Sequence, residues 1–251
     1  MSQSSLMSRP PRKLLHQSQE LVNRYIRIAV HRWMKRRAQA LARRISRLRL
    51  QWSERSRKAA LVSALETFAI EAAKARRLGL EASTIVLNLG LFFLIAERDI
   101  QAVKIDALTH PDAWTRGLAA RVMLLTIHEL DIDKVAGNKL RQALDDGKIP
   151  EPLRQQVTDA MRDIRKAQAR AQRQFAYLRN STIAHRDPDA IRQHRDIVEL
   201  DGLEVTKVAV DFYTGTRKFI EMIPRLLAQL YSLKGILGQL SAQGSRKGDG
   251  N

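Results

Sequence analysis

Apolar and small residues recur at intervals of three and four along most of this chain, and that spacing predicts α-helices. No strand-like alternation stands out, apart from a stretch at 203–210 that fits a helix equally well. Neither glycine nor proline interrupts the chain between Arg12 and Gly79, so helical structure is predicted over that whole span. The pattern therefore predicts an all-α protein.

The most apolar run covers residues 82–96 (ASTIVLNLGLFFLIA) and is closely bracketed by charged residues. Because its 15 residues fall short of the ~20 that cross a membrane, a buried central helix continuing towards Ala107 is favoured over a membrane span. The sequence THPD at 109–112 is typical of a helix start, since proline is tolerated in the first turn and an acidic residue suits the positive end of the helix dipole. Further helices are predicted over 112–130 and 132–144.

A long helix is predicted to begin after Ile149 and Pro150, and a short one to cover 190–198. A final helix is predicted from Glu204 to about Leu240, with a bend near Pro224. The inward stripe of the long helix, read in steps of three and four towards His185, consists of Leu153, Val157, Ala160, Ile164, Ala167, Ala171, Gln174, Leu178 and Thr182.

The basic charge is concentrated at the beginning of the chain. The whole chain has a formal net charge of +18 and a pI near 10.9. Residues 1–58 hold 16 Lys and Arg against 2 acidic residues, whereas residues 59–251 hold 28 against 24. This asymmetry predicts a basic N-terminal arm at 1–58, a helical bundle at 59–240 and a flexible tail at 241–251. It also predicts a polyanionic partner.

The arm is predicted to be disordered over the Ser- and Pro-rich residues 1–11 and to continue as an amphipathic helix. Such a helix fits nucleic acid, a membrane surface or an acidic protein, and it fits equally a helix that docks its apolar stripe on the bundle. An organellar transit peptide, or a true start at Met7 or Met34, is also compatible with the sequence. The apolar stripe comprises Leu14, Leu21, Tyr25, Ala29, Trp33, Leu41, Ile45, Leu48 and Trp52.

The composition excludes several kinds of site. The chain has no cysteine, so it has neither a disulfide nor a thiolate metal site, which suits a reducing cytoplasm. Its six histidines show no HExxH-like spacing, and no glycine-rich phosphate loop is present. We therefore expect a cytoplasmic protein without metal or cofactor.

The segment RNSTIAHRD, residues 179–187, holds the strongest candidate for a reactive site. It places Arg179 and Asn180 shortly before His185, with Asp187 next and a proline behind it. An imidazole can move a proton to or from a ribose hydroxyl, and a guanidinium can stabilise the charge that builds on a phosphate. Arg121 and His128 have a similar spacing, as chance allows in a chain this rich in arginine.

This segment resembles the motif of the HEPN superfamily, in which four to six residues separate an arginine from a histidine. The resemblance implies a HEPN-like helical bundle and a metal-independent endoribonuclease of the toxin or phage-defence type. It implies that His185 acts as general acid or base, that Arg179 binds the scissile phosphate and that Asn180 contacts the phosphate or orients the histidine. Asp187 would fix the imidazole tautomer. RNA as substrate, a homodimer and a protein antitoxin are the partners that it implies.

Other interpretations of the same residues remain open. On a regular helix, Arg179 and His185 lie about 120° apart and ~9 Å apart along the axis, so a break near Asn180 or a second subunit is needed to bring them together. His185 is also compatible with a core histidine or a helix cap. His128 and Glu129, near the end of the 112–130 helix, are weaker candidates for the site. The two alternative functions are a non-catalytic helical protein that binds nucleic acid or a partner through the arm, and a peripheral membrane protein.

Overall fold

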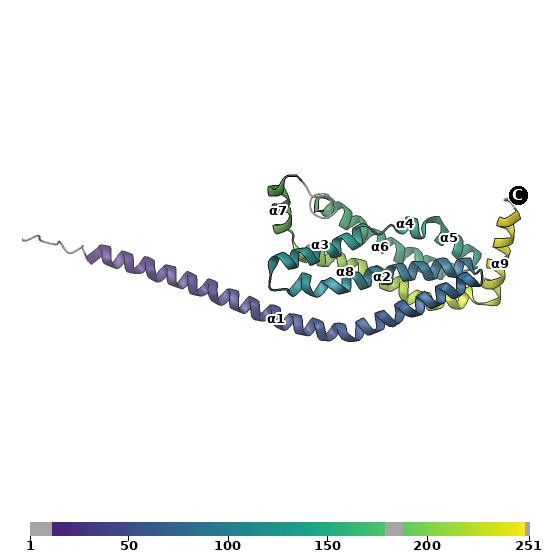
Figure 1. Cartoon of the computed structure of the whole chain (residues 1–251), viewed down its shortest axis with the longest axis horizontal. Coiled ribbons are helices and arrows are strands. Elements are labelled where there is room, and N and C mark those ends of the chain that lie inside the picture. The colour runs from purple at the N-terminus through teal and green to yellow at the C-terminus, as the bar shows by residue number, and fades with distance from the viewer. Residues whose placement is uncertain (1–11, 179–187, 249–251) are drawn as a thin grey trace, which may run out of the picture. The chain divides into compact units, whose positions relative to one another are not determined.

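The computed structural model describes residues 12–178 and 188–248, and every regular element in these ranges is an α-helix (Figure 1). The prediction of an all-α protein is thus confirmed for the described residues. The helices are α1 (Arg12–Arg77), α2 (Glu81–Thr109), α3 (Ala113–His128), α4 (Ile132–Val135), α5 (Gly137–Asp146), α6 (Glu151–Leu178), α7 (Ala190–Val198), α8 (Gly202–Leu230) and α9 (Leu233–Gly248).

The chain divides into two compact units, residues 1–48 and residues 49–251. The described residues of the first unit, 12–48, belong entirely to α1. In the sequence the charge asymmetry places a boundary after residue 58, whereas the division by contacts follows Leu48. The difference has a physical reason, because Glu54 and Arg57 already form ion pairs with side chains of α2.

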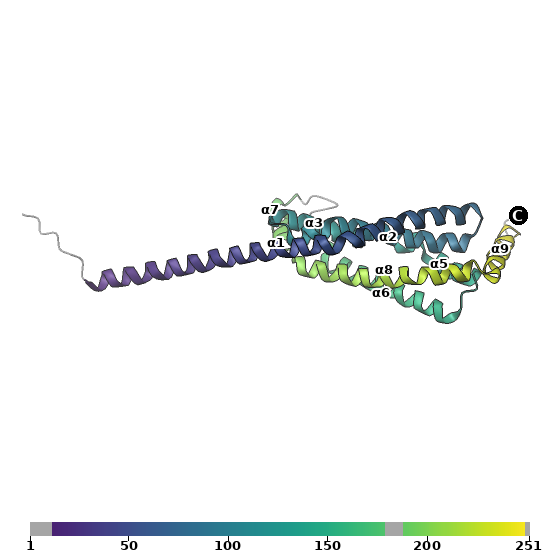
Figure 2. The ribbon, with the colours of Figure 1, turned by 90° about the horizontal axis from the view of Figure 1, so that it is seen from below.

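The second unit is a bundle in which α2, α3, α6 and α8 pack along one another (Figure 2). The apolar run at 82–96 lies within α2, and its Val86, Leu89 and Phe93 are fully buried. The ring of Phe93 meets that of Phe219 from α8 edge to face, with 5.4 Å between centroids. The central buried helix predicted for this run is therefore confirmed.

The last turns of α1 pack on the bundle through small and aromatic side chains. Phe68 and Ala75 contact a cluster that includes Leu87 of α2 and Leu227 of α8. The helix then ends at Arg77, and Gly79 takes a φ of +69°, a conformation that favours glycine. The end of the first long helix at this glycine agrees with the sequence pattern.

Two elements differ from the helices that the sequence predicts. The expected helix at 132–144 is split into α4 and α5, because Gly137 takes a φ of +44° between them. The expected final helix continues past Pro224 and instead breaks at Tyr231, after which Ser232 accepts a hydrogen bond from the Gly235 amide at 3.1 Å. The tail expected to be flexible is helical as far as Gly248.

One position in a side-chain pattern was predicted incorrectly, and the exposed side of α3 is unusual. On α6, Gln174 is exposed and Phe175 takes its place in the buried stripe, whose other described members are all buried. On α3, the side that carries Trp114, Leu118 and Val122 faces solvent, with exposed fractions of 51%, 50% and 37%. The buried side of α3 consists of Ala119, Ala120, Arg121, Met123, Leu124 and Ile127.

None of the described helices has both the length and the apolar character needed to cross a bilayer. Residues 82–96 instead contribute buried side chains to the middle of the bundle.

We expect Gly215→Ala to lower the free energy of unfolding by about 1–3 kcal/mol. A Cβ atom at Gly215 would lie 2.7 Å from Cγ1 of Ile164 and 2.9 Å from its backbone nitrogen, so α6 and α8 would have to move apart. The matched control is Gly117→Ala on α3, where the nearest atom is the Ile197 carbonyl oxygen at 3.8 Å. That control should be neutral or stabilise by up to about 1 kcal/mol. Equal effects in urea denaturation would contradict the close approach.

Candidate functional site

The four candidate site residues, Arg179, Asn180, His185 and Asp187, lie outside the described residues. The elements on either side of them are described. Helix α6 ends at Leu178, which is 1% exposed, so the motif begins directly after a side chain anchored in the core. Helix α7 begins at Ala190, two residues after Pro188.

The start of α7 is fixed by an N-cap. The Asp189 carboxylate accepts hydrogen bonds from the backbone amides of Ile191 at 3.0 Å and Arg192 at 3.1 Å. Proline followed by an Asp cap is a strong signal for a new helix, and the predicted helix at 190–198 is confirmed with the same bounds. The motif is therefore followed by a well-defined helix start.

Helix α3 runs antiparallel to α6 beside the end that leads into the motif. Gln168 donates to the backbone oxygen of Leu130, and Gln172, one turn further along α6, donates to that of His128 at 3.4 Å. Since both helices rise 1.5 Å per residue, continuing this register brings Leu178 level with Arg121. Arg121 thus lies on the helix beside the entry to the motif.

Arg121 is 7% exposed, which is rare for an arginine without a carboxylate partner. Its Nε donates to the Gly117 carbonyl at 3.3 Å, and its guanidinium carbon lies 5.9 Å from the ring centroid of Trp114. No carboxylate of the described residues forms an ion pair with it, and burial lowers the pKa of its guanidinium. The ring of His194 from α7 lies 6.4 Å from that of Trp114.

His128 and Glu129 occupy the end of α3 and contact each other, with 3.0 Å between Nδ1 and Oε1. They line an open hollow of about 550 Å³ together with Asp131, Arg165 and Gln168. A histidine near the last turn also complements the helix dipole, which accounts for His128 without a catalytic role.

Tyr177 lies two residues before the motif and is 40% exposed. Burial raises the pKa of its hydroxyl, and the charges of Asp196 and Glu199 on α7 raise it further. The phenol therefore stays neutral at physiological pH.

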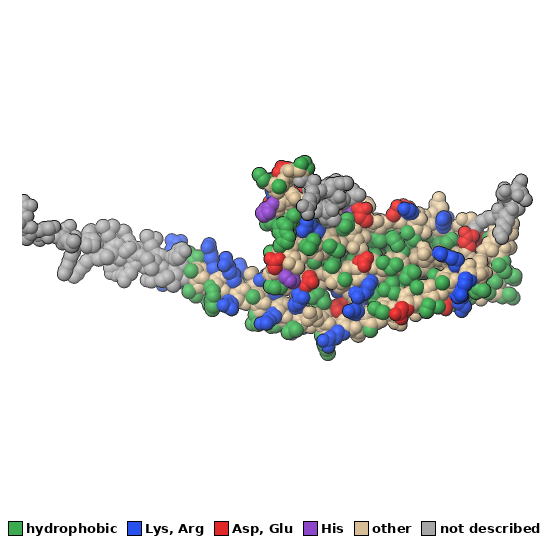
Figure 3. All heavy atoms as spheres, viewed as in Figure 1, with side chains coloured by type: hydrophobic (Ala, Val, Ile, Leu, Met, Phe, Trp, Pro, Cys, Tyr) green, Lys and Arg blue, Asp and Glu red, His purple; other side chains and the backbone are tan. Residues whose placement is uncertain are grey.

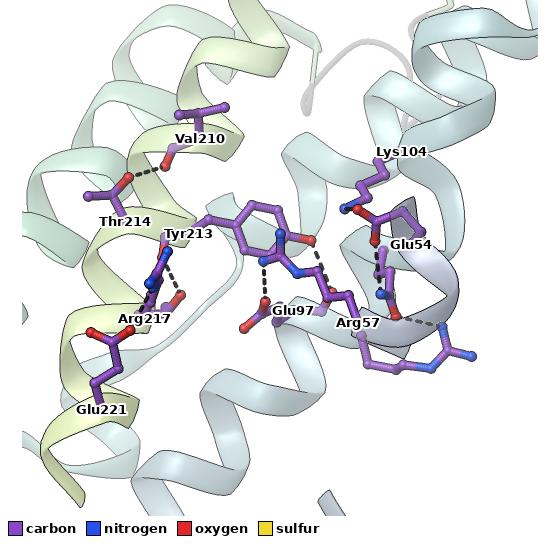
Figure 4. Close-up of polar contacts among 12 residues, drawn as sticks. Glu54, Arg57, Glu97, Lys104, Val210, Tyr213, Thr214, Arg217 and Glu221 are labelled. Carbon is purple, nitrogen blue, oxygen red and sulfur yellow. Dashed lines mark hydrogen bonds and ion pairs between the residues drawn. The ribbon is translucent and has the colours of Figure 1, made fainter. Parts of the chain in front are cut away.

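A second polar cluster lies between α1, α2 and α8 (Figure 4). The Arg57 guanidinium pairs with Glu97 at 2.7 Å and lies 4.9 Å from the ring centroid of Tyr213. The Tyr213 hydroxyl donates to the Glu97 backbone oxygen at 3.2 Å. Burial raises the pKa of Tyr213 well above its ordinary value, and the charge of Glu97 adds to this. The phenol is therefore a neutral hydrogen-bond donor rather than a base.

The same cluster contains a partly buried ion pair. Lys104 and Glu54 are 2.6 Å apart, with side chains 13% and 14% exposed, and Gln101 donates to the same carboxylate at 3.0 Å. Burial alone raises the pKa of Glu54, but the hydrogen bonds from Lys104 and Gln101 outweigh it and leave that pKa below its ordinary value. This cluster joins α1 to the bundle, and we assign it a structural role.

Lys104→Met should lower the free energy of unfolding by about 1–3 kcal/mol at neutral pH, because it leaves the partly buried Glu54 carboxylate charged and without its ammonium partner. Since the folded pKa of Glu54 lies below the unfolded value, its stabilising effect is present above about pH 4 and is lost as the pH falls. The difference between variant and wild type should therefore shrink in acid. Urea denaturation at several pH values measures it.

The matched control is Lys218→Met, which removes the exposed pair with Asp163, 2.6 Å apart and with side chains 55% and 36% exposed. It should cost less than about 1 kcal/mol, because solvent screens exposed pairs. A Lys104 variant as stable as this control at neutral pH would contradict the structural role of the cluster.

The described part of the first unit has no buried side chain. Between Arg24 and Leu48, every described side chain is exposed or partly exposed, among them Trp33 at 58% and Leu41 at 60%. Lys and Arg side chains alternate with apolar ones along this part of α1 (Figure 3). Arg37 packs over the ring of Trp33, 5.4 Å from its centroid. Within its own unit, this surface is available to a polyanion.

Neither Arg121 with Trp114 nor the Tyr213 cluster was identified from sequence. The one available signal for the second is Glu54, the only acidic residue between Glu20 and Glu66 in a strongly basic stretch. Among the described residues, no group of three or more His, Asp or Glu side chains is arranged so that it could hold a metal ion. Comparison with protein-family models, with curated proteins and with solved structures finds no match to this chain.

Proposed function

We propose that this protein is a metal-independent endoribonuclease of the HEPN type. The observation that carries the proposal is the segment RNSTIAHRD, which puts Arg179 and Asn180 before His185 and Asp187. An all-α bundle, with α6 described as far as Leu178 and α7 starting at Ala190, is compatible with the proposal.

In the proposed reaction, His185 accepts the proton of a ribose 2′-hydroxyl, and the 2′-oxygen attacks the adjacent phosphorus. The bond from phosphorus to the 5′-oxygen of the next nucleotide breaks, and that oxygen takes up a proton. Arg179 stabilises the additional negative charge on the phosphoryl oxygens, Asn180 donates a hydrogen bond to them or to the histidine, and Asp187 holds the imidazole tautomer. The products are a 2′,3′-cyclic phosphate and a 5′-hydroxyl.

The direct test is incubation of purified full-length protein with a labelled single-stranded RNA in the presence of EDTA. We expect cleavage that EDTA leaves unchanged and products that end in a 2′,3′-cyclic phosphate. Sensitivity to EDTA, or products with a 5′-phosphate, would contradict the mechanism. A homodimer, a toxin or phage-defence role and a neutralising antitoxin are proposals that depend on a positive result.

A second candidate function is favoured by the exposed arm. Residues 1–48 hold 12 Lys and Arg against a single acidic residue, and none of their described side chains is buried within the unit. Such a surface binds a nucleic-acid backbone by neutralising phosphates and releasing counterions. We propose that the arm binds RNA, either to supply substrate to the nuclease or as the main activity of a non-catalytic protein.

A further inference from the structure

Arg121 has the features of an anion-binding residue. Its stem is buried, yet no N or O atom of a described side chain is both buried and without a hydrogen-bond partner. No residue that the structure describes accepts a hydrogen bond from the two Nη atoms of Arg121. A guanidinium without a carboxylate partner can bind a phosphate in a bidentate contact.

Trp114 provides a second, independent feature next to this arginine. Its indole is 51% exposed, which is unusual for the largest apolar side chain. It lines a hollow of about 220 Å³ between α3 and α7, together with Gly117 and Ile197. His194 adds an aromatic ring beside it. Exposed aromatic rings next to a cation are the usual platform on which proteins stack unpaired nucleobases.

We propose that Trp114, Arg121 and His194 form a nucleotide-binding subsite for single-stranded RNA, in which the indole stacks on a base and the guanidinium binds the adjoining phosphate. The proposal rests on the proposed ribonuclease function, because Arg121 lies level with the last residue of α6, from which the motif continues. The subsite binds a nucleotide beside the scissile one and positions the chain. Arg121 and Trp114 are positioning residues and take no part in proton transfer.

A second copy of this chain is the competing occupant of the same face, since Leu118 and Val122 also present apolar surface there. The charge argues for RNA. A dimer contact that covered Arg121 would bury further a cation that has no carboxylate partner among the described residues, which costs several kcal/mol unless a carboxylate of the other copy accompanies it. An RNA phosphate supplies a negative charge for the Arg121 guanidinium, and the attached base can stack on the Trp114 indole.

The test uses full-length protein in which Trp33 and Trp52 are replaced by phenylalanine, so that Trp114 is the only tryptophan. The probe is a 2′-O-methyl oligouridylate of about six nucleotides, which cannot be cleaved. Stacking on the indole should quench its fluorescence on titration. Arg121→Gln should raise the midpoint of the titration about tenfold, whereas Arg141→Gln, which removes an exposed arginine on α5, should leave it within about twofold.

The far-UV circular dichroism of each variant reports whether it folds. If Arg121→Gln does not fold, Trp114→Ala in the otherwise natural chain replaces it, and loss of photo-crosslinking between α3 and a 4-thiouridine form of the probe is expected. Absence of quenching, or an Arg121 variant that binds like the Arg141 control, would overturn the subsite. So would a Trp114→Ala variant that merely turns a dimer into a monomer in sedimentation without changing RNA binding. Because the probe is uncleavable, a failed subsite is distinguishable from a failed nuclease.

Discussion

Replacing His185 with alanine should slow RNA cleavage at least about 100-fold, because general acid–base catalysis by a positioned imidazole contributes roughly 10²–10⁴-fold. Arg179→Ala should cause a comparable loss by removing the charge that stabilises the transition state, and Arg179→Lys should restore little of it, since an ammonium lacks the planar fork of donors. Initial rates on one defined RNA at saturating concentration measure both effects.

The chain offers a matched control for this prediction. Arg121 and His128 are also an arginine and a histidine with the spacing of the motif. The imidazole of His128, however, is paired with the Glu129 carboxylate at the end of α3. His128→Ala should therefore cleave within about threefold of wild type. If it is as inactive as His185→Ala, loss of folding accounts for both. If His185→Ala retains the wild-type rate, the nuclease proposal is wrong.

Helix ends were predictable wherever a local signal fixes them. Gly79 supplies the positive φ that ends α1, and Asp112 accepts from the Thr115 amide at 2.7 Å to begin α3. Both signals act within four residues of the chain, so sequence alone reveals them. The break at Gly137 was missed although a glycine with a positive φ marks it, and the break at Tyr231 was missed because the apolar pattern continues across it.

Side-chain environment was predictable only for long, regular stripes. On α6 the three- and four-residue steps identify the buried side correctly except at one position, where Phe175 is buried instead of the predicted Gln174. On α3 the large apolar side chains face outward, because alanines carry the close helix contacts. A count of apolar residues cannot anticipate this, since alanine is chosen there for its small volume.

The candidate site shows the same division between local and tertiary information. The order of Arg179, Asn180 and His185 is visible in the sequence, and so is the basic arm. Arg121 could not be singled out among so many arginines, because its burial results from the packing of α3 within the folded bundle and beside α7. Trp114 and His194 stand 80 positions apart in the chain and meet only in the fold.

The arm should dominate affinity for RNA. We expect the full-length quadruple variant Arg36, Arg37, Arg43 and Arg44→Gln to bind an uncleavable single-stranded RNA about 10²–10³-fold more weakly at roughly 0.1 M salt. The slope of log K against log salt should become less steep by up to about 3, because each neutralised phosphate contributes about 0.7 for a single strand. Fluorescence anisotropy over a series of salt concentrations measures both quantities.

A control variant that loses the same charge elsewhere tests whether the arm binds RNA specifically or only through the net charge of the protein. The control replaces Arg141, Arg162, Arg217 and Arg225, which lie on the surface of the second unit, with glutamine. It should weaken binding less than about tenfold, because charges spread over a surface are screened beyond ~10 Å and do not act together on one strand. Equal losses in the two variants would refute an RNA-binding arm.

Flotation with anionic vesicles tests the alternative of a membrane surface. If the arm variant retains RNA binding but no longer floats with the vesicles, the arm binds a membrane surface instead. If cleavage persists in the arm variant at high RNA concentration, the arm delivers substrate to a nuclease whose chemistry resides in the bundle.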